Sequence, residues 1–377
     1  MAGVWALRGG TTTEARRDVG TAACDSEKNV RIEYVANGQA ARNKIHSRAS
    51  SVPGVYAEQT EVNDVMVVPG KRRLRIALID MNNGVENQAM RCLRLIATRF
   101  HEHTKASNPQ LEMEIVHISP RDKGEAPPDD CHLYLSSGGP GSPYDGDGQQ
   151  WTTDYYRFLD NIVEENVAKG ESARGLFGVC YSYEMIVRHF KLATMAPRAT
   201  RKFGVMPVYM TNMGRAHPLL QPFGDRLFAF EHRNWEAIDL DETQLAKLGG
   251  KVLALESREG QSDKGRAILG LDAAPGVETV QFHPEADRPG VVAWVSRPDQ
   301  AAAFREAYGD ETYERMLKTL DDPNRLARTF AILIPGWMVR KFNAQAASMG
   351  WNPVGPPEMD ANAFSVDAKA PDARAAG

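Results

Sequence analysis

The sequence predicts an α/β protein in which a doubly wound, mostly parallel sheet carries helices on both faces, followed by a helical C-terminal extension. Two observations predict this class. Short apolar runs without alternation, typical of strands buried on both faces, recur between residues 73 and 179. Amphipathic helical stretches separate these runs, and strands that alternate with helices are typical of a parallel sheet covered on both sides.

The first half of the pattern is regular. Strand patterns cover residues 73–81, 111–118, 132–136 and 176–179. Around residues 90–100 apolar side chains recur at spacings of three and four, which predicts a helix. A second helical pattern runs over residues 151–170, where Gly170 ends it.

Strand patterns dominate from about residue 203. They cover residues 203–210, 225–232, 251–257, 266–272 and 277–283, and residues 297–351 are helical in character. We therefore predict four segments: a partly disordered N-terminal arm at residues 1–70, the α/β domain at residues 71–297, a helical extension at residues 298–352 and a disordered tail at residues 353–377.

Composition excludes several classes of protein. Of 377 residues, 42% are hydrophobic and 25% charged, as in an ordinary globular chain, and the net charge of −4 gives no reason to expect nucleic acid or an anionic membrane as partner. No apolar run approaches the ~20 residues of a membrane helix, and no secretory signal is visible. The four cysteines, irregularly spaced, indicate neither disulfides nor a zinc site. We expect a cytoplasmic protein without metal or cofactor.

Cys180 stands between an apolar strand pattern and the start of a helix. In open α/β sheets ligands collect at the carboxyl ends of strands, where such a turn projects a side chain into the crevice. The free N–H groups and the dipole of the new helix favour an anion and so make a thiol more reactive. Gly178 and Ser182 flank the cysteine at −2 and +2, and both are small, as a strained turn requires. The alternative is a buried, inert cysteine.

A candidate base for the thiol lies 103 residues further on. VETVQFHPEAD is a buried strand pattern that ends in His283, followed by Pro284 and Glu285. Imidazole can hold a thiol as thiolate and later protonate a leaving group near neutral pH. Glu285 can accept the other ring N–H and so fix the tautomer. The alternative is a structural histidine beside a solvated carboxylate.

The third element is a glycine-proline loop, SSGGPGSP, directly after the strand at residues 132–136. Acyl transfer needs backbone N–H donors where the tetrahedral oxyanion forms, and Gly138 and Gly139 allow the backbone to approach closely. The loop lacks the glycine and lysine spacing of a phosphate-binding loop and is too short for a calcium loop. A plain surface turn remains open.

These three pieces together resemble class I glutamine amidotransferases, which use a Cys-His-Glu triad. VQFHPEAD is similar to the family's F-H-P-E element, GVCYSYE to its G-x-C-x-G-x-Q turn and SSGGPGSP to its oxyanion loop, most like the amidotransferase domain of GMP synthetase. The resemblance covers roughly residues 73–297. It implies the family's flavodoxin-like fold and glutamine hydrolysis through a cysteine thioester.

The resemblance also implies a role for each residue. Cys180 would attack the amide of glutamine, His283 would protonate the departing ammonia and Glu285 would orient His283. The N–H groups of Gly139 and Tyr181 would hold the oxyanion, with Gly138 beside them in the substrate-binding loop.

Two residues depart from the family pattern within the turn. Ser182 stands where glycine is usual, and Glu184 where the family has a glutamine that helps to hold the substrate. A carboxylate at position 184 would repel the α-carboxylate of glutamine. Asn234 and Glu236 occupy a stretch that often carries an aspartate, which adds a further difference.

Three functions follow from these observations. The first is a glutamine amidotransferase or glutaminase that acts on glutamine or a related amide. Since nothing in the chain resembles an ammonia-accepting domain, the acceptor would be a separate synthetase. The second is another acyl-transfer or C–N hydrolase reaction on the same triad, and the third is a non-catalytic binding protein. The apolar C-terminal helices could cap the core, form a homodimer or dock a partner.

Overall fold

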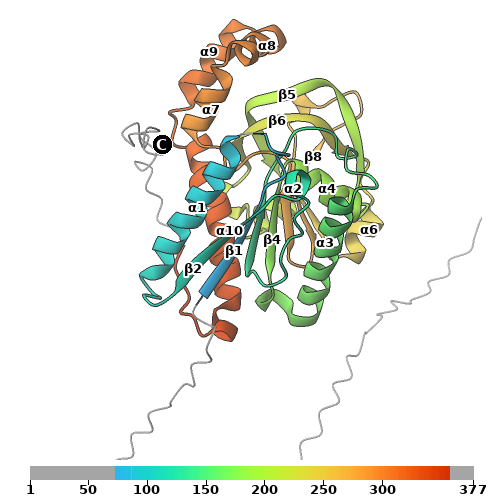
Figure 1. The fold of residues 1–377 in the computed structure, drawn as a ribbon. Coiled ribbons are helices and arrows are strands. Elements are labelled where there is room, and N and C mark those ends of the chain that lie inside the picture. The colour runs from blue at the N-terminus through green and yellow to red at the C-terminus, as the bar shows by residue number, and fades with distance from the viewer. Residues whose placement is uncertain (1–72, 86, 357–377) are drawn as a thin grey trace, which may run out of the picture. The chain divides into compact units, whose positions relative to one another are not determined.

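The computed structural model describes residues 73–85 and 87–356. The predicted N-terminal arm and nearly all of the predicted tail lie outside these residues. Five strands form the parallel half of one sheet, in the order β2 (Glu112–Ile118), β1 (Arg73–Ile79), β3 (Leu133–Ser136), β4 (Gly175–Val179) and β9 (Val277–Val280). The strands predicted in this half are confirmed, and Figure 1 labels β2, β1 and β4 in this half of the sheet.

The other half of the sheet is antiparallel and closes on itself. It contains β8 (Ile268–Ala274), β6 (Arg226–Ile238), β5 (Thr194–Met210) and β7 (Lys251–Leu255), and β7 pairs back with β8 to complete a small barrel. The prediction of a mostly parallel sheet is therefore wrong for this half. No long helix separates these strands, and without such a crossover successive strands pair in antiparallel fashion.

Two helical layers cover the parallel half. The α-helices of the described residues, four of which form these layers, are α1 (Gln88–Lys105), α2 (Pro120–Lys123), α3 (Gln150–Lys169), α4 (Tyr181–His189), α5 (Asn212–Ala216), α6 (Glu242–Lys247), α7 (Arg288–Val295), α8 (Pro298–Tyr308), α9 (Asp310–Thr319) and α10 (Leu326–Met349). Helices α1 and α10 pack on one face of the parallel strands, and α3 and α4 pack on the other (Figure 1).

Strand β1 shows how one strand serves both faces. Ile76 and Leu78 are buried in the core beneath α1 and α10, whereas Ala77 and Ile79 are buried in the core beneath α3 and α4. Successive side chains of a strand point to opposite faces, so a strand covered on both sides has to be apolar throughout. This explains the unbroken apolar run in the sequence.

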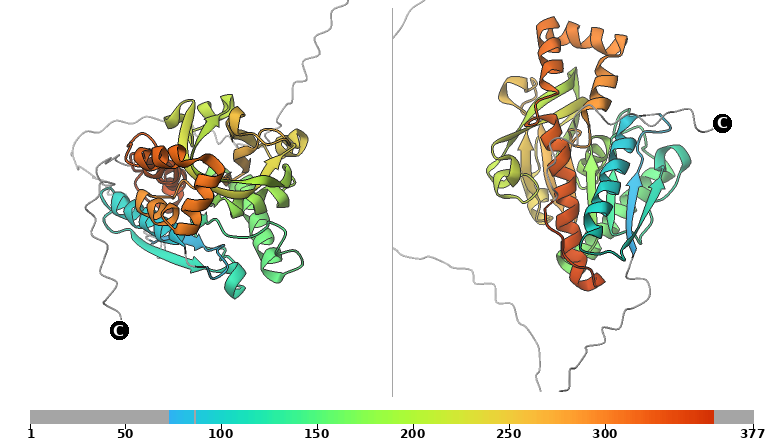
Figure 2. Two further views of the ribbon diagram at one scale, coloured as in Figure 1. Left: turned by 90° about the horizontal axis from the view of Figure 1, so that it is seen from above. Right: turned by 90° about the vertical axis from the view of Figure 1, so that its left-hand side faces the viewer.

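The C-terminal helices divide into two groups. Helix α10 belongs to the main core, where Trp337 packs edge-on against Phe177 of β4 at 5.5 Å between ring centroids. Helices α7, α8 and α9 share a smaller core with β5 and β6, in which Phe304 packs against Phe203 at 5.2 Å. The right-hand view of Figure 2 shows these helices, in orange, at the upper end of the long red helix α10. Gly309, with φ +84°, separates α8 from α9. The predicted domain boundaries at residues 297 and 298 stay a prediction.

Within the described residues, no helix is both long enough and apolar enough to span a bilayer.

Candidate active site

Cys180 occupies a strained turn between β4 and α4. Its backbone has φ +50° and ψ −103°, it is the N-cap of α4, and its side chain is buried, with 5% exposed. Gly178 is needed for this turn, because a Cβ there would lie 2.6 Å from Cδ1 of Ile186. A non-glycine residue at positive φ is costly and persists where the surroundings hold it, as at many active sites.

Ser182, which stands where the family that the sequence resembles usually has glycine, fits this turn. Its hydroxyl lies 2.7 Å from the hydroxyl of Ser136 and donates to the carbonyl of Ser137 at 2.7 Å. Both partners belong to the end of β3 and the loop that follows it. The extra hydroxyl is therefore satisfied and ties the start of α4 to the glycine loop.

His283 lies across the end of the sheet from α4. Its backbone N–H donates to the carbonyl of Phe230 in β6 at 2.8 Å, which fixes the chain just after β9. Its Nδ1–H donates to Oε1 of the buried Glu285 at 2.8 Å. This hydrogen bond selects the tautomer and leaves Nε2 for a second partner.

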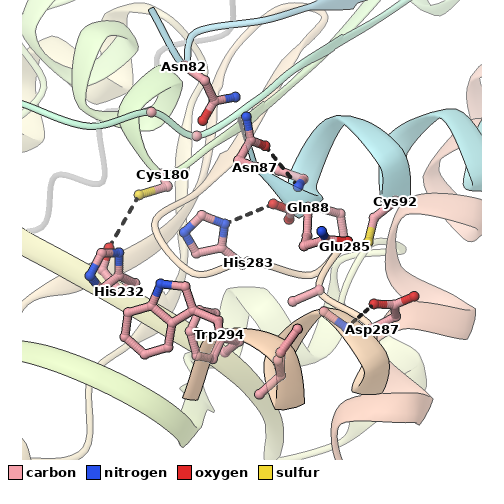
Figure 3. Close-up of a pocket in the computed structure, with 18 of the residues that line it drawn as sticks. Asn82, Asn87, Gln88, Cys92, Cys180, His232, His283, Glu285, Asp287 and Trp294 are labelled. Carbon is pink, nitrogen blue, oxygen red and sulfur yellow. Dashed lines mark hydrogen bonds and ion pairs between the residues drawn. The ribbon is translucent and has the colours of Figure 1, made fainter. Parts of the chain in front are cut away.

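Cys180 and His283 both line the pocket, and their side chains lie near each other there (Figure 3). Burial lowers the pKa of His283, but the charge of Glu285 and the charge and hydrogen bond of Cys180 outweigh it, so this pKa is raised well above 6.5. Both partners thus favour the protonated form of the imidazole. The sulfur of Cys180 also lies 3.9 Å from the carbonyl oxygen of His232.

The glycine loop lies against both side chains. A Cβ on Gly138 would lie 2.8 Å from Cε1 of His283 and 3.2 Å from Cβ of Cys180. A Cβ on Gly139 would lie 2.0 Å from the carbonyl oxygen of Met81. Within the described residues no hydrogen bond uses the N–H of Gly139 or of Tyr181. These donors are the pair expected from the sequence to hold an oxyanion.

Arg121 holds the loop in place, and sequence reasoning missed it. Its Nη1 donates to the carbonyl groups of Met81 and Pro140, each at 2.8 Å. Its guanidinium also lies 4.1 Å from the ring centroid of Tyr181. Arg121 belongs to the one-turn helix α2, between the strand patterns at residues 111–118 and 132–136, and so short a helix gives no periodic signal.

The cavity beside Cys180 has a volume of about 510 Å³. The start of α1 contributes Asn87 and Gln88 to its lining, α7 contributes Trp294, and Arg297 lies at the N-cap of α8. Trp294 packs edge-on against His232 at 4.7 Å between ring centroids. Sequence reasoning missed all of these residues, because their positions before α1 and after the F-H-P-E element become neighbours only through the fold.

His232 is a neutral imidazole in this lining. Burial, followed by the charges of His283 and Arg201, lowers its pKa to about 4. Near neutral pH it therefore offers a hydrogen-bonding ring and no charge.

Two predicted substrate-binding positions do not line the cavity. The side chain of Glu184 is only 3% exposed and accepts a hydrogen bond from Nε2 of Gln281 at 3.0 Å. The phenol of Tyr181 is buried, and its hydroxyl has no hydrogen-bond partner among the described residues. Glu236 is also buried, where it pairs with Arg198 and accepts from Ser262 at 2.7 Å, while Asn234 is exposed.

The described residues contain no cluster of three or more His, Cys, Asp or Glu side chains suited to a metal ion.

Burial raises the pKa of Glu184 to about 7. A carboxyl group whose pKa is higher in the folded than in the unfolded state stabilises the protein at low pH and loses that contribution as the pH rises through the folded value. Glu184→Gln should therefore raise the free energy of unfolding by up to about 3 kcal/mol at about pH 8.5 and by little at about pH 4. Urea unfolding at both values measures this, and an equal change at both would contradict it.

No family model matches the chain, and no curated protein matches it either. Solved structures do. It is similar to a glutamine amidotransferase from Thermotoga maritima, with 16% identity and a TM-score of 0.43, and the match covers 73% of this chain and 98% of that one. It is similar to another from Methylobacillus flagellatus, with 15% identity and a TM-score of 0.44, and the match covers 75% of this chain and 97% of that one. It is also similar to a protein assigned as a GMP synthase subunit from Thermoplasma acidophilum (17%, 0.37, 62% and 96%). Two of these structural neighbours are described as glutamine amidotransferases and the third as a GMP synthase subunit. At such low identity the likeness says nothing about chemistry, which has to come from the residues of the site.

Proposed function

We propose that this protein hydrolyses the side-chain amide of glutamine through a thioester on Cys180, as class I glutamine amidotransferases do. One observation carries the proposal. A cysteine in a strained turn at a helix N-terminus interacts with a histidine whose pKa is raised well above 6.5 and which a buried glutamate orients. This is the arrangement of an activated nucleophile and its base.

The first half-reaction would form the thioester. The thiolate of Cys180 attacks the amide carbon, and the carbonyl oxygen becomes an oxyanion within reach of the N–H groups of Gly139 and Tyr181. His283 gives its Nε2 proton to the amide nitrogen, the C–N bond breaks and ammonia leaves. Glu285 keeps Nδ1 protonated throughout and stabilises the imidazolium before transfer.

The second half-reaction would return the enzyme to its starting state. His283, now neutral, takes a proton from water while the water oxygen attacks the thioester carbon. The C–S bond breaks, glutamate leaves, and the sulfur and the imidazole regain their starting charges. We propose that a separate synthetase accepts the ammonia, in keeping with the family resemblance.

A second candidate is hydrolysis of an amide with an uncharged acyl chain. Within the described lining, Asp287 pairs with Arg91 at 2.6 Å and Arg297 pairs with Asp299 at 3.4 Å. Glu285 pairs with His283, and His232 is neutral. Each charged side chain of the described lining thus already has a partner of opposite charge, and burying the ammonium and carboxylate of free glutamine without partners would be costly.

The test is a release assay with purified protein and a panel of amides. Glutamine, N-acetylglutamine and simple carboxamides are each incubated with the protein, and ammonia and the corresponding acid are measured. We expect equal amounts of the two products from glutamine, and faster release from the uncharged amides would favour the second candidate. Absence of ammonia and acid from every member of the panel would contradict amide hydrolysis.

A further inference from the structure

Gln281 is a buried residue next to the candidate nucleophile, Cys180. It follows β9, two residues before His283, and only 1% of it is exposed. Its Nε2 donates to Oε1 of Glu184 at 3.0 Å and lies 4.0 Å from Sγ of Cys180. A single amide nitrogen thus directs its two N–H groups at a carboxylate and at the sulfur.

The orientation of this amide depends on Glu184. The Oε1 atom of Gln281 is buried and has no hydrogen-bond partner among the described residues. An ionised carboxylate accepts hydrogen bonds and cannot donate one, so it can bind only the nitrogen of the amide. Ionised Glu184 therefore keeps Nε2, and with it an N–H, on the side of Cys180.

We propose that Gln281 is a positioning residue that directs an N–H toward the thiolate of Cys180, and that ionised Glu184 fixes the orientation of the Gln281 amide. The role rests on the proposed function insofar as Cys180 is the nucleophile. An N–H directed at the sulfur favours the thiolate over the thiol, whereas the amide oxygen in its place would repel the thiolate.

A proton on Glu184, or a glutamine in its place, removes this control. Either one can donate a hydrogen bond to Oε1 of Gln281, so the reversed amide becomes as acceptable as the observed one. In the reversed orientation the amide oxygen lies nearer the sulfur. The reactivity of Cys180 should then fall even though a negative charge nearby has been removed.

Charged groups on several elements act on Glu184. The titratable and charged groups that face it are Arg233 from β6, Arg121 from α2, His283 after β9, and Tyr181 and Tyr183 from α4. Burial of Glu184 outweighs the hydrogen bond from Gln281 and the three positive charges, which places its pKa at about 7. Burial also raises the pKa of both tyrosines, so they stay neutral over the range of interest. Glu184 therefore changes charge in the range where the reaction would operate.

The test is the rate constant for alkylation of Cys180 by iodoacetamide, resolved from the other cysteines by peptide mass spectrometry. It is measured for the wild type and Glu184→Gln at about pH 8.5 and about pH 5.5, on either side of the Glu184 pKa. At the higher pH we expect the variant to react about fivefold more slowly. At the lower pH Glu184 is protonated in the wild type as well, so the two rates should converge.

Two outcomes would overturn the proposal. If Glu184→Gln reacts faster than the wild type at the higher pH, Glu184 acts on the thiolate only as a nearby negative charge. If the variant is slower by the same factor at both pH values, the substitution has merely disturbed the structure. By contrast, wild-type Cys180 that reacts no faster than Cys92 and Cys131 would contradict the proposed function itself.

Two further variants test the part played by the amide. Gln281→Met keeps the length of the side chain and removes the N–H, so it should lower the rate at the higher pH as much as Glu184→Gln does. The double variant should be no slower than either single one, because both remove the same contact. Tyr134→Phe is the matched control. It removes a hydroxyl of a buried residue of β3 that donates to the carbonyl of Pro128 at 2.7 Å, away from the lining of the cavity, and should keep the wild-type rates.

Discussion

Replacing Cys180 by serine is expected to lower kcat/KM for amide hydrolysis by about 10⁴-fold or more. A serine hydroxyl does not ionise near neutral pH, so the charged pair with His283 cannot form. The interaction with Cys180 is one of the causes that raise the pKa of His283, so this pKa should fall in the variant. Ammonia release and titration of the imidazole ring by NMR measure the two effects.

The same variant has its own control for folding. Serine and cysteine are similar in size, so the free energy of unfolding should change by only about 1 kcal/mol. A Cys180→Ser protein that retains turnover within tenfold of the wild type would show that the thiol is not the nucleophile. An unchanged His283 pKa would show that the two side chains do not interact.

The substitution Gly138→Ala should lower kcat by about 10²- to 10³-fold. Its Cβ would lie 2.8 Å from Cε1 of His283 and 3.2 Å from Cβ of Cys180, so the loop or the histidine has to move. A shift of this size separates the base from the thiol and displaces the backbone donors next to it. Steady-state kinetics with the best amide from the release assay measures the loss.

A glycine on α10 provides the matched control. A Cβ on Gly336 would meet nothing within 4 Å, and this residue lies inside a helix where alanine is favoured. Gly336→Ala should keep the wild-type kcat and raise the free energy of unfolding by about 0.5–1 kcal/mol. If Gly138→Ala also keeps the wild-type kcat, the loop is not in contact with the reacting atoms.

The sequence predicted the parallel half of the fold well, because each strand there has to be apolar on both faces. The run at β1 shows the reason, since Ile76 and Ala77 are buried in different cores. The barrel was not predicted. Strands β5 to β8 have patterns that suit either kind of pairing, and closure depends on contacts between β7 and β8 that no local pattern encodes.

The central part of the candidate site could also be predicted. Cys180, His283 and the two loop glycines each stand at the end of a strand, so parallel pairing brings them to one edge of the sheet. The rest depended on tertiary structure. The burial of Glu184 and its hydrogen bond to Gln281 join a helix to the end of a strand, and no local pattern distinguishes Gln281 from any other residue at a strand end.

The lining residues from α7 and from the start of α1 were missed for a related reason. Trp294 lies on α7, and Asn87 precedes α1, about two hundred residues away in the chain. Each residue fits an ordinary helical pattern on its own. Only the packing of both helices over the end of the sheet makes them neighbours of Cys180.

The most direct measurement compares how fast iodoacetamide alkylates Cys180, Cys92 and Cys131 near pH 7, in the wild type and in His283→Gln. Burial raises the pKa of the Cys92 and Cys131 thiols to about 12, so both should be nearly inert. We predict that Cys180 reacts at least about 100-fold faster than either and that His283→Gln abolishes most of this advantage. A Cys180 as slow as the other two, or one that His283→Gln leaves unchanged, would contradict a reactive pair formed by this thiol and this imidazole.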